Sequence, residues 1–255
     1  MQHTNGSKQL RIGEGAAMNG IISISGIALL LTAAGMLIGL MDRRNFAPAW
    51  LIAAAALVVL NDVLLTELYG LLPDMIPGAA WNWQGKGLAL LATLGIAALP
   101  WFGWQRSGLT LHQAPGSLRA CAPIAVLYCL FFAGLAGAFP GDEASAETIA
   151  FQLTMPSLEE EPFYRGILLL ALGEAFRGRR RWLGVDWHWG ALLSCLLFGL
   201  AHAFSYADGS VSFDAITMAL TAVPSVLAVW MRLRTGSLVL PVLLHSAGNA
   251  IPLLL

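Results

Sequence analysis

The sequence predicts an all-α membrane protein, a polytopic bundle of about eight transmembrane helices. Of its 255 residues, 57% are hydrophobic and only 11% are charged, whereas an average soluble domain is about a quarter charged. The mean hydropathy is +0.70. Apolar stretches recur along the whole chain, and about 20 apolar helical residues suffice to cross a bilayer core about 30 Å thick.

The apolar stretches define the candidate spans in chain order. They run near residues 20–41, 48–70, 87–104, 121–139, 147–172, 188–206, 214–231 and 237–255. The third is short and has Pro100 near its end, and the fifth contains the densest cluster of charges. These two stretches therefore differ most from a simple apolar span.

The polar segment 1–19 predicts an N-terminal tail, and residues 20–255 predict a single transmembrane domain. No polar linker is long enough to separate two units. The first apolar stretch ends at Met41-Asp42-Arg43-Arg44 and lacks an A-x-A-like cleavage site. We therefore expect it to be retained as a span.

The basic residues between the spans fall mainly on one side of the membrane. That side contains Arg43, Arg44, Arg106, Arg119, Arg177, Arg179, Arg180, Arg181, Arg232 and Arg234. The other side contains Lys8, Arg11 and Lys86. Because short loops rich in Lys and Arg remain in the cytoplasm, the arginine-rich side is predicted to be cytoplasmic and both termini to lie outside. The formal net charge is −1, so no basic field argues for a nucleic-acid partner.

The fifth stretch contains ionisable side chains that lipid disfavours. Glu159, Glu160, Glu161 and Arg165 lie in the segment MPSLEEEPFYRGILLL, and each such group costs about 2.5–3.5 kcal/mol at the centre of a span. Glu161 and Arg165 are four residues apart, so they can pair on one helix face. Glu160 points about 100° away from Glu161 and is free to face a cavity. Pro162, directly after the acids, is expected to kink the helix.

Two later stretches contain polar residues at helical spacing. The segment FGLAH places His202 one turn after Phe198, and HSAGN places Asn249 one turn after His245. A single histidine in a membrane helix commonly packs or bonds to a neighbouring helix, so neither histidine alone indicates a function. Together with the acids of the fifth stretch, they favour a site built from three helices.

These segments, in this order, resemble the motifs of the CPBP family of intramembrane proteases, which includes the eukaryotic CAAX-prenyl endopeptidase and many bacterial members. The family pattern is E-E-x-x-x-R, then F-x-x-x-H, then H-x-x-x-N or D. Here the motifs begin at Glu160, Phe198 and His245, within residues 150–250. The segments WNWQGKG and GLTLHQAPGSLR also look like stretches seen in some bacterial members.

The resemblance implies a glutamate-type endopeptidase whose catalytic core covers about residues 147–255. Glu160, aided by His202, would remove a proton from water as that water attacks the scissile carbonyl. His245 and Asn249 would donate hydrogen bonds to the oxyanion. The supporting residues would be Glu161 and Arg165 as a structural ion pair and Phe198 as a packing residue.

The implied partners are a protein or peptide substrate in the membrane and the lipid bilayer. Known members act on prenylated C-termini, on leader peptides or on sorting tails, and nothing in the sequence selects among these. The short, sparsely charged chain with its retained first span suggests a bacterial member, hence a multi-pass protein of the bacterial cytoplasmic (inner) membrane. His202 falls toward the non-cytoplasmic end of its helix, which favours cleavage at the outer face.

Alternatives to a glutamate protease follow from the same residues. No cofactor is expected, but Glu160, His202 and His245 could ligate a catalytic zinc with an open position, although H-E-x-x-H is absent. A catalytically silent immunity or scaffold protein would keep the same fold. A transporter would line its pathway with the polar residues of the second stretch, although no internal repeat relates the two halves of the chain. Those residues are Asn61, Asp62 and Glu67.

Glu159 is an additional acid before the first motif. Two neighbouring carboxylates in lipid are costly unless one is protonated or solvated. We therefore expect Glu159 to mark a water-filled mouth, or alternatively to be the base itself. The spacing to Arg165 favours Glu160 as the base.

Overall fold

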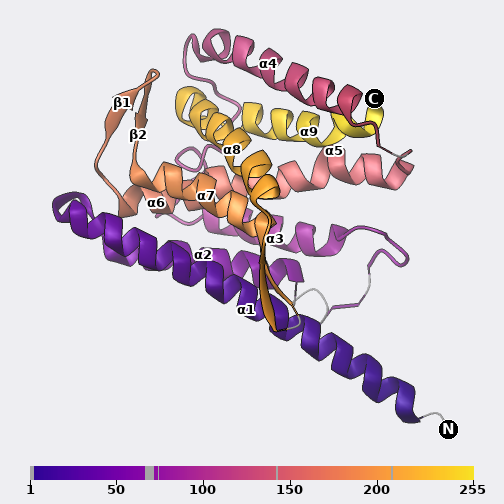
Figure 1. The fold of residues 1–255 in the computed structure, drawn as a ribbon. Helices are drawn as coiled ribbons and strands as arrows, with labels where there is room; N and C mark the ends of the chain where they lie inside the picture. Colours follow the sequence, from indigo (N-terminus) through magenta and orange to yellow (C-terminus); the bar gives the residue numbers. More distant parts are fainter. Residues whose placement is uncertain (1–2, 67–71, 74, 142, 208) are drawn as a thin grey trace.

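The fold is a bundle of helices with two small hairpins (Figure 1). The structure is a computed structural model that describes residues 3–66, 72–73, 75–141, 143–207 and 209–255. The helices are α1 (His3–Met41), η1 (Arg43–Asn45), α2 (Pro48–Thr66), α3 (Trp83–Ala97), α4 (Ser117–Ala138), α5 (Ala146–Glu161), η3 (Pro162–Leu168), α6 (Leu169–Ala175), α7 (Trp189–Ala203), α8 (Ala215–Thr235) and α9 (Val239–Leu254). The antiparallel hairpins pair β1 (Arg180–Trp182) with β2 (Val185–Trp187) and β3 (Phe204–Ala207) with β4 (Ser210–Phe213).

The prediction of an all-α membrane protein is confirmed. Each predicted stretch contains a helix, and four helices in the described part are long and apolar enough to cross a membrane. These are Met18–Met41, Pro48–Thr66, Ser117–Ala138 and Ala215–Thr235. Trp189–Ala203 and Val239–Leu254 are apolar but shorter, and α3 has 15 residues. The number of membrane crossings therefore stays a prediction.

The fifth stretch is not one regular α-helix. α5 ends at Glu161, and η3 continues as a π-helix that begins at Pro162 and ends at Leu168, where α6 begins. Proline has no backbone N–H to donate, so the regular α-helical bonding cannot continue through it. The predicted disturbance at Pro162 thus takes the form of a widened turn, a feature often found at functional sites.

Polar caps fix where several helices begin. Asn82 accepts a hydrogen bond from the Gly85 N–H at 2.9 Å at the start of α3. His188 Nδ1 accepts one from the Ala191 N–H at 3.1 Å at the start of α7. Asp214 accepts bonds from two backbone N–H groups at the start of α8. Each cap satisfies donors that the first helical turn leaves free.

The helices bury a core around the fifth stretch. α7 packs on α8, α5 on α9, α1 on α2 and α4 on α9. All seven residues of η3 are buried, and Arg165 has only 2% of its surface exposed. A fully buried arginine in an apolar bundle needs a partner inside it.

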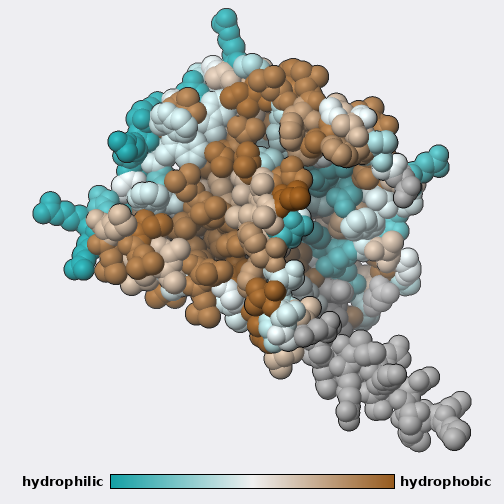
Figure 2. All heavy atoms as spheres, viewed as in Figure 1, coloured by the Kyte–Doolittle hydropathy of each residue, from teal (hydrophilic) through white to brown (hydrophobic). Residues whose placement is uncertain are grey.

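The outer surface is largely apolar. Figure 2 shows apolar side chains over the middle of the face in view and hydrophilic side chains near its edges. Large apolar side chains such as Leu29, Leu37, Leu127 and Ile216 are more than 60% exposed. Exposed apolar surface on this scale is what a lipid solvent requires.

The arginine-bearing loops meet at one end of the bundle. Arg106 pairs with Glu174 at 2.6 Å, and Arg232 donates a hydrogen bond to the Arg106 carbonyl at 2.7 Å. Arg234 donates to the Gly184 carbonyl in the β1–β2 turn at 3.2 Å. Loops that the charge bias assigned to one side of the membrane therefore lie side by side.

Candidate active site

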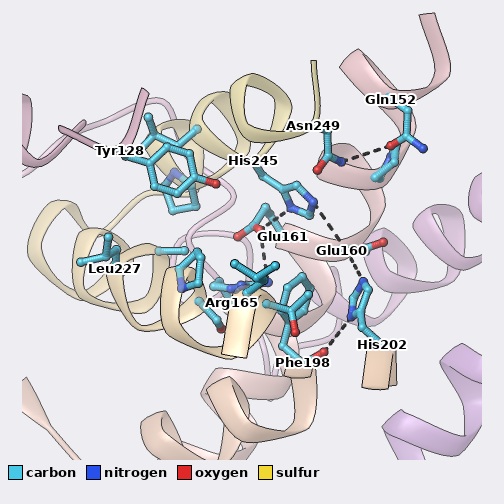
Figure 3. Close-up of a pocket in the computed structure, with 18 of the residues that line it drawn as sticks. Tyr128, Gln152, Glu160, Glu161, Arg165, Phe198, His202, Leu227, His245 and Asn249 are labelled. Atoms are coloured by element: carbon cyan, nitrogen blue, oxygen red, sulfur yellow. Dashed lines mark hydrogen bonds and ion pairs between the residues drawn. The ribbon is translucent and has the colours of Figure 1, made fainter. Parts of the chain in front are cut away.

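The three motifs meet at one cavity of about 450 Å³ (Figure 3). Its lining includes all of the predicted site residues, which come from α5, η3, α7 and α9. They are Glu160, Glu161, Arg165, Phe198, His202, His245 and Asn249.

Glu160 points one carboxylate oxygen at both histidines. Its Oε2 lies 3.9 Å from His202 Nε2 and 3.8 Å from His245 Nε2. Oε2 is buried and has no hydrogen-bond partner within the described residues. A water oxygen about 2.8 Å from Oε2 and from either nitrogen fits these separations. The three atoms therefore outline a position for one water molecule.

The other ring nitrogen of each histidine is already engaged. His202 Nδ1–H donates a hydrogen bond to the Phe198 carbonyl oxygen at 2.7 Å, because a carbonyl oxygen can only accept. His245 Nδ1–H donates to Glu161 Oε1 at 2.8 Å. These bonds place a proton on Nδ1 of each ring and leave Nε2 of each ring facing Glu160.

Glu161 has two partners. The predicted pair with Arg165 is present, with Nη1 3.1 Å from Oε1 in a setting where both side chains are almost completely buried. The same oxygen accepts the hydrogen bond from His245. Glu161 therefore orients a histidine of the site in addition to neutralising the buried arginine.

Phe198 packs against several side chains of the site. The Arg165 guanidinium lies 4.0 Å from the centre of its ring. The rings of His202 and His245 lie 4.7 Å and 5.9 Å away, and the Tyr164 ring stands on its edge at 5.0 Å. Phe198 thus supports both histidines and the buried cation.

Asn249 lies on α9 at the far wall of the cavity. Its Nδ2 donates to Gln152 Oε1 at 3.3 Å across to α5 (Figure 3). This bond engages one of the two N–H groups of the Asn249 amide. Gln152 was not singled out in the sequence because no motif includes it.

Lys86, at the start of α3, is a part of the site that sequence reasoning missed. Its Nζ lies 2.5 Å from Glu160 Oε1 and 2.7 Å from Glu159 Oε2. Asn61 Nδ2 donates to the remaining oxygen of Glu159 at 3.1 Å. Glu159 is completely buried. Glu159, the additional acid, is therefore neutralised by a lysine from another helix. The sequence did indicate that two adjacent carboxylates need a cation nearby.

The segment WNWQGKG explains how Lys86 reaches the site. Asn82 caps α3 and also donates to the Leu65 carbonyl at 2.7 Å. The Trp83 ring meets Phe151 of α5 edge-on at 5.0 Å. A Cβ on Gly85 would lie 2.7 Å from the Leu65 carbonyl oxygen, so glycine is needed for this approach. These contacts hold the first turn of α3 against α2 and α5.

The polar residues of the second stretch lie beside the site. Asn61 and Asp62 line a second cavity that also reaches Glu160. Glu67 lies outside the described residues.

A metal ion would need three ligands at about 2.0–2.2 Å from one point. Among the residues that the structure describes, no group of three or more His, Cys, Asp or Glu side chains has an arrangement that could hold one. The ammonium of Lys86 already supplies a cation to the Glu160 carboxylate. Zinc dependence stays a hypothesis that a chelator tests.

The comparisons with known proteins agree with the motifs. Residues 143–251 match a family model that is described as type II CAAX prenyl endopeptidase Rce1-like. A search of curated proteins and a search of solved structures found no match. The matched family implies a membrane protease, a peptide hydrolase acting on a peptide in the membrane. The matched region contains all three motifs, so residues 143–251 of the chain are similar to the CAAX-prenyl-endopeptidase family.

Proposed function

We propose that this chain is a glutamate-type intramembrane endopeptidase in which Glu160 is the general base. The observation that carries the proposal is the geometry at Glu160. Lys86 holds one carboxylate oxygen, and the other is buried, lacks a hydrogen-bond partner in the described part of the chain, and lies beside two histidine nitrogens. A carboxylate in this setting can accept a proton from a bound water.

The hydrolysis proceeds in two steps. Water between Oε2 and His202 Nε2 attacks the scissile carbonyl carbon, its proton passes to Glu160, and the carbonyl electrons move to the oxygen. The tetrahedral intermediate then expels the amine as the C–N bond breaks, and the amine takes the proton from Glu160. One peptide bond and one water are consumed, and the carboxylate is regenerated.

The oxyanion is stabilised by His245 and Asn249. Because Nδ1–H of His245 is engaged by Glu161, His245 can donate from Nε2 only with a second proton. Two carboxylates, Glu160 and Glu161, lie beside this ring and are suited to pair with an imidazolium. In soluble proteases, loss of one oxyanion donor costs about 2.7–4 kcal/mol.

The substrate class is a membrane-associated or sorted protein. Tyr128, Phe132, Leu220, Leu227 and Leu244 give the cavity an apolar wall from α4, α8 and α9. Such a wall suits an apolar peptide segment that arrives from lipid. The proposed location is the bacterial inner membrane, with cleavage near its outer face.

The test compares the wild type with Glu160→Gln and a matched control, Glu174→Gln. Glu174 pairs with Arg106 at the opposite end of the bundle. The readout is cleavage of a library of quenched membrane peptides in liposomes, with and without a zinc chelator. We expect Glu160→Gln to lose about 10²–10⁴-fold in kcat, the control to stay active and the chelator to have no effect.

Other outcomes decide between the alternatives. Activity that a chelator abolishes and added zinc restores would establish the zinc mechanism. A fully active Glu160→Gln variant would refute the assignment of the base. If the wild type cuts no peptide in the library, an ion-flux assay tests the transporter alternative.

A further inference from the structure

A second cavity of about 260 Å³ lies behind Glu160. Residues of α1, α2 and α7 contribute to it, among them Ser23, Val58, Asn61 and Asp62. The first cavity instead takes its apolar wall from α4, α8 and α9. α1 and α2 therefore line only the second cavity, and α4, α8 and α9 line only the first.

Lys86, Glu160 and His202 line both cavities. The carboxylate of Glu160 thus stands in the wall between them, and the ammonium of Lys86 ties it to Glu159 and α3. With Oε1 held by Lys86, Oε2 is left beside the Nε2 atoms of His202 and His245. Glu160, the proposed base, can therefore contact one molecule in the first cavity and a different molecule in the second.

The polar part of the second cavity's lining suits water. A water molecule takes about 30 Å³ of liquid volume and needs two to four polar partners, so 260 Å³ has room for several. Ser23, Asn61, Asp62 and Glu159 contribute polar atoms to its lining, beside apolar residues such as Ile24, Ile27 and Leu197. The second cavity is also smaller than the first, about 260 Å³ against about 450 Å³, so a peptide segment fits the first cavity better.

We propose that the second cavity is a water chamber that delivers the hydrolytic water to Glu160 while the peptide occupies the first cavity. The inference rests on the proposed function of Glu160. A peptide that fills the first cavity blocks water from that side, yet each turnover consumes one water. Entry from the α1–α2 side removes this conflict.

The experiment uses single cysteines in an otherwise cysteine-free protein, with Cys121, Cys129 and Cys195 replaced by alanine. Ser23→Cys and Val58→Cys place a thiol in the chamber, and Leu29→Cys, on the same helix as Ser23 but 69% exposed toward lipid, is the control. A charged methanethiosulfonate reagent reacts with thiols in water. We expect both chamber thiols to react and the Leu29→Cys thiol to stay unmodified.

Kinetics then link the chamber to turnover. Modification at Ser23→Cys or Val58→Cys fills the chamber and should lower kcat at least tenfold with KM unchanged. Modification of Leu227→Cys, in the peptide cavity, should instead raise KM. The proposal is overturned if the chamber thiols do not react while the Leu227→Cys thiol does, or if the modified chamber variants keep full kcat.

The labelling does not depend on proteolysis. Reactive chamber thiols in a protein that cleaves no peptide would support a hydrated chamber and count against the proposed protease. Unreactive chamber thiols in an active protease would refute the chamber and leave the proposed function intact. The two failures are therefore distinguishable.

Discussion

The double role of Glu161 can be separated with a double substitution. Glu161 shares one oxygen between Arg165 and His245. In Glu161→Met, both partners lose their acceptor. In Glu161→Met/Arg165→Met, the buried cation is removed as well, but the acceptor for His245 is still missing. The fold and the catalytic geometry should therefore respond differently to the second substitution.

The magnitudes follow from burial. Arg165 is 2% exposed, and leaving one partner of a buried ion pair alone costs about 3–5 kcal/mol. Removing Arg165 as well relieves that cost but loses its stacking on Phe198 at 4.0 Å, worth about 2 kcal/mol when desolvated. The double variant should therefore recover about 2 kcal/mol of unfolding free energy relative to Glu161→Met.

Activity should not follow stability. Without Glu161, His245 has no acceptor to hold its ring, and a misplacement of about 1 Å can cost about 10²-fold in rate. Glu161→Met and the double variant should therefore lose similar activity, whereas Arg165→Met alone, which keeps the Glu161–His245 bond, should lose less. Unfolding in mixed micelles and kcat for a quenched peptide measure the two effects. Recovery of activity together with stability in the double variant would refute the orienting role.

Two further predictions concern Lys86 and His188. Lys86→Met leaves Glu159 and Glu160 without their shared cation and should lower kcat about 10²-fold. Lys86→Arg should restore part of this activity. An unchanged kcat in Lys86→Met would show that the contact is incidental. Burial, together with the nearby Arg179, lowers the pKa of His188 to about 3. The neutral His188 side chain therefore contributes to the stability of the fold above its ordinary pKa of about 6.5, and this contribution is lost as the pH falls from about 6.5 toward 3. The wild-type Tm should therefore drop more between pH 7 and pH 5 than the Tm of His188→Asn, and equal drops would contradict the assignment.

The motif residues could be found from the sequence because their signal is local. Spacings of four residues place Glu161 with Arg165, Phe198 with His202 and His245 with Asn249 on shared helix faces. Charges inside apolar stretches then indicate a need for partners inside the bundle. All these residues line the first cavity.

Lys86 could not be assigned in the same way. It lies 74 residues before Glu160 in the chain, and only the packing of α3 on α5 brings them together. In the sequence, Lys86 reads as a basic residue at the end of a short apolar stretch. The need of Glu159 for a counterion was readable, but which cation meets it depends on tertiary structure.

The departures from regular helix were also only partly readable. The apolar stretch near 188–206 extends past the end of α7 at Ala203 because β3 begins with apolar Phe204. The β1–β2 turn relies on positive φ at Leu183 and Gly184, a local conformation that the basic run before it does not reveal. Hydropathy alone does not distinguish a helix end from an apolar strand.

The position of α4 has a consequence for how a substrate can enter. α4 lies at the edge of the bundle (Figure 1) and packs mainly on α9 and α8. Within this helix, Ser117, Cys121 and Ala136 are its buried residues, so tilting it exposes little core to lipid. Its Tyr128 and Phe132 nevertheless form part of the cavity wall. α4 therefore forms a wall of the first cavity while burying few of its own residues, so a tilt of this helix would open that cavity to a peptide that arrives from lipid.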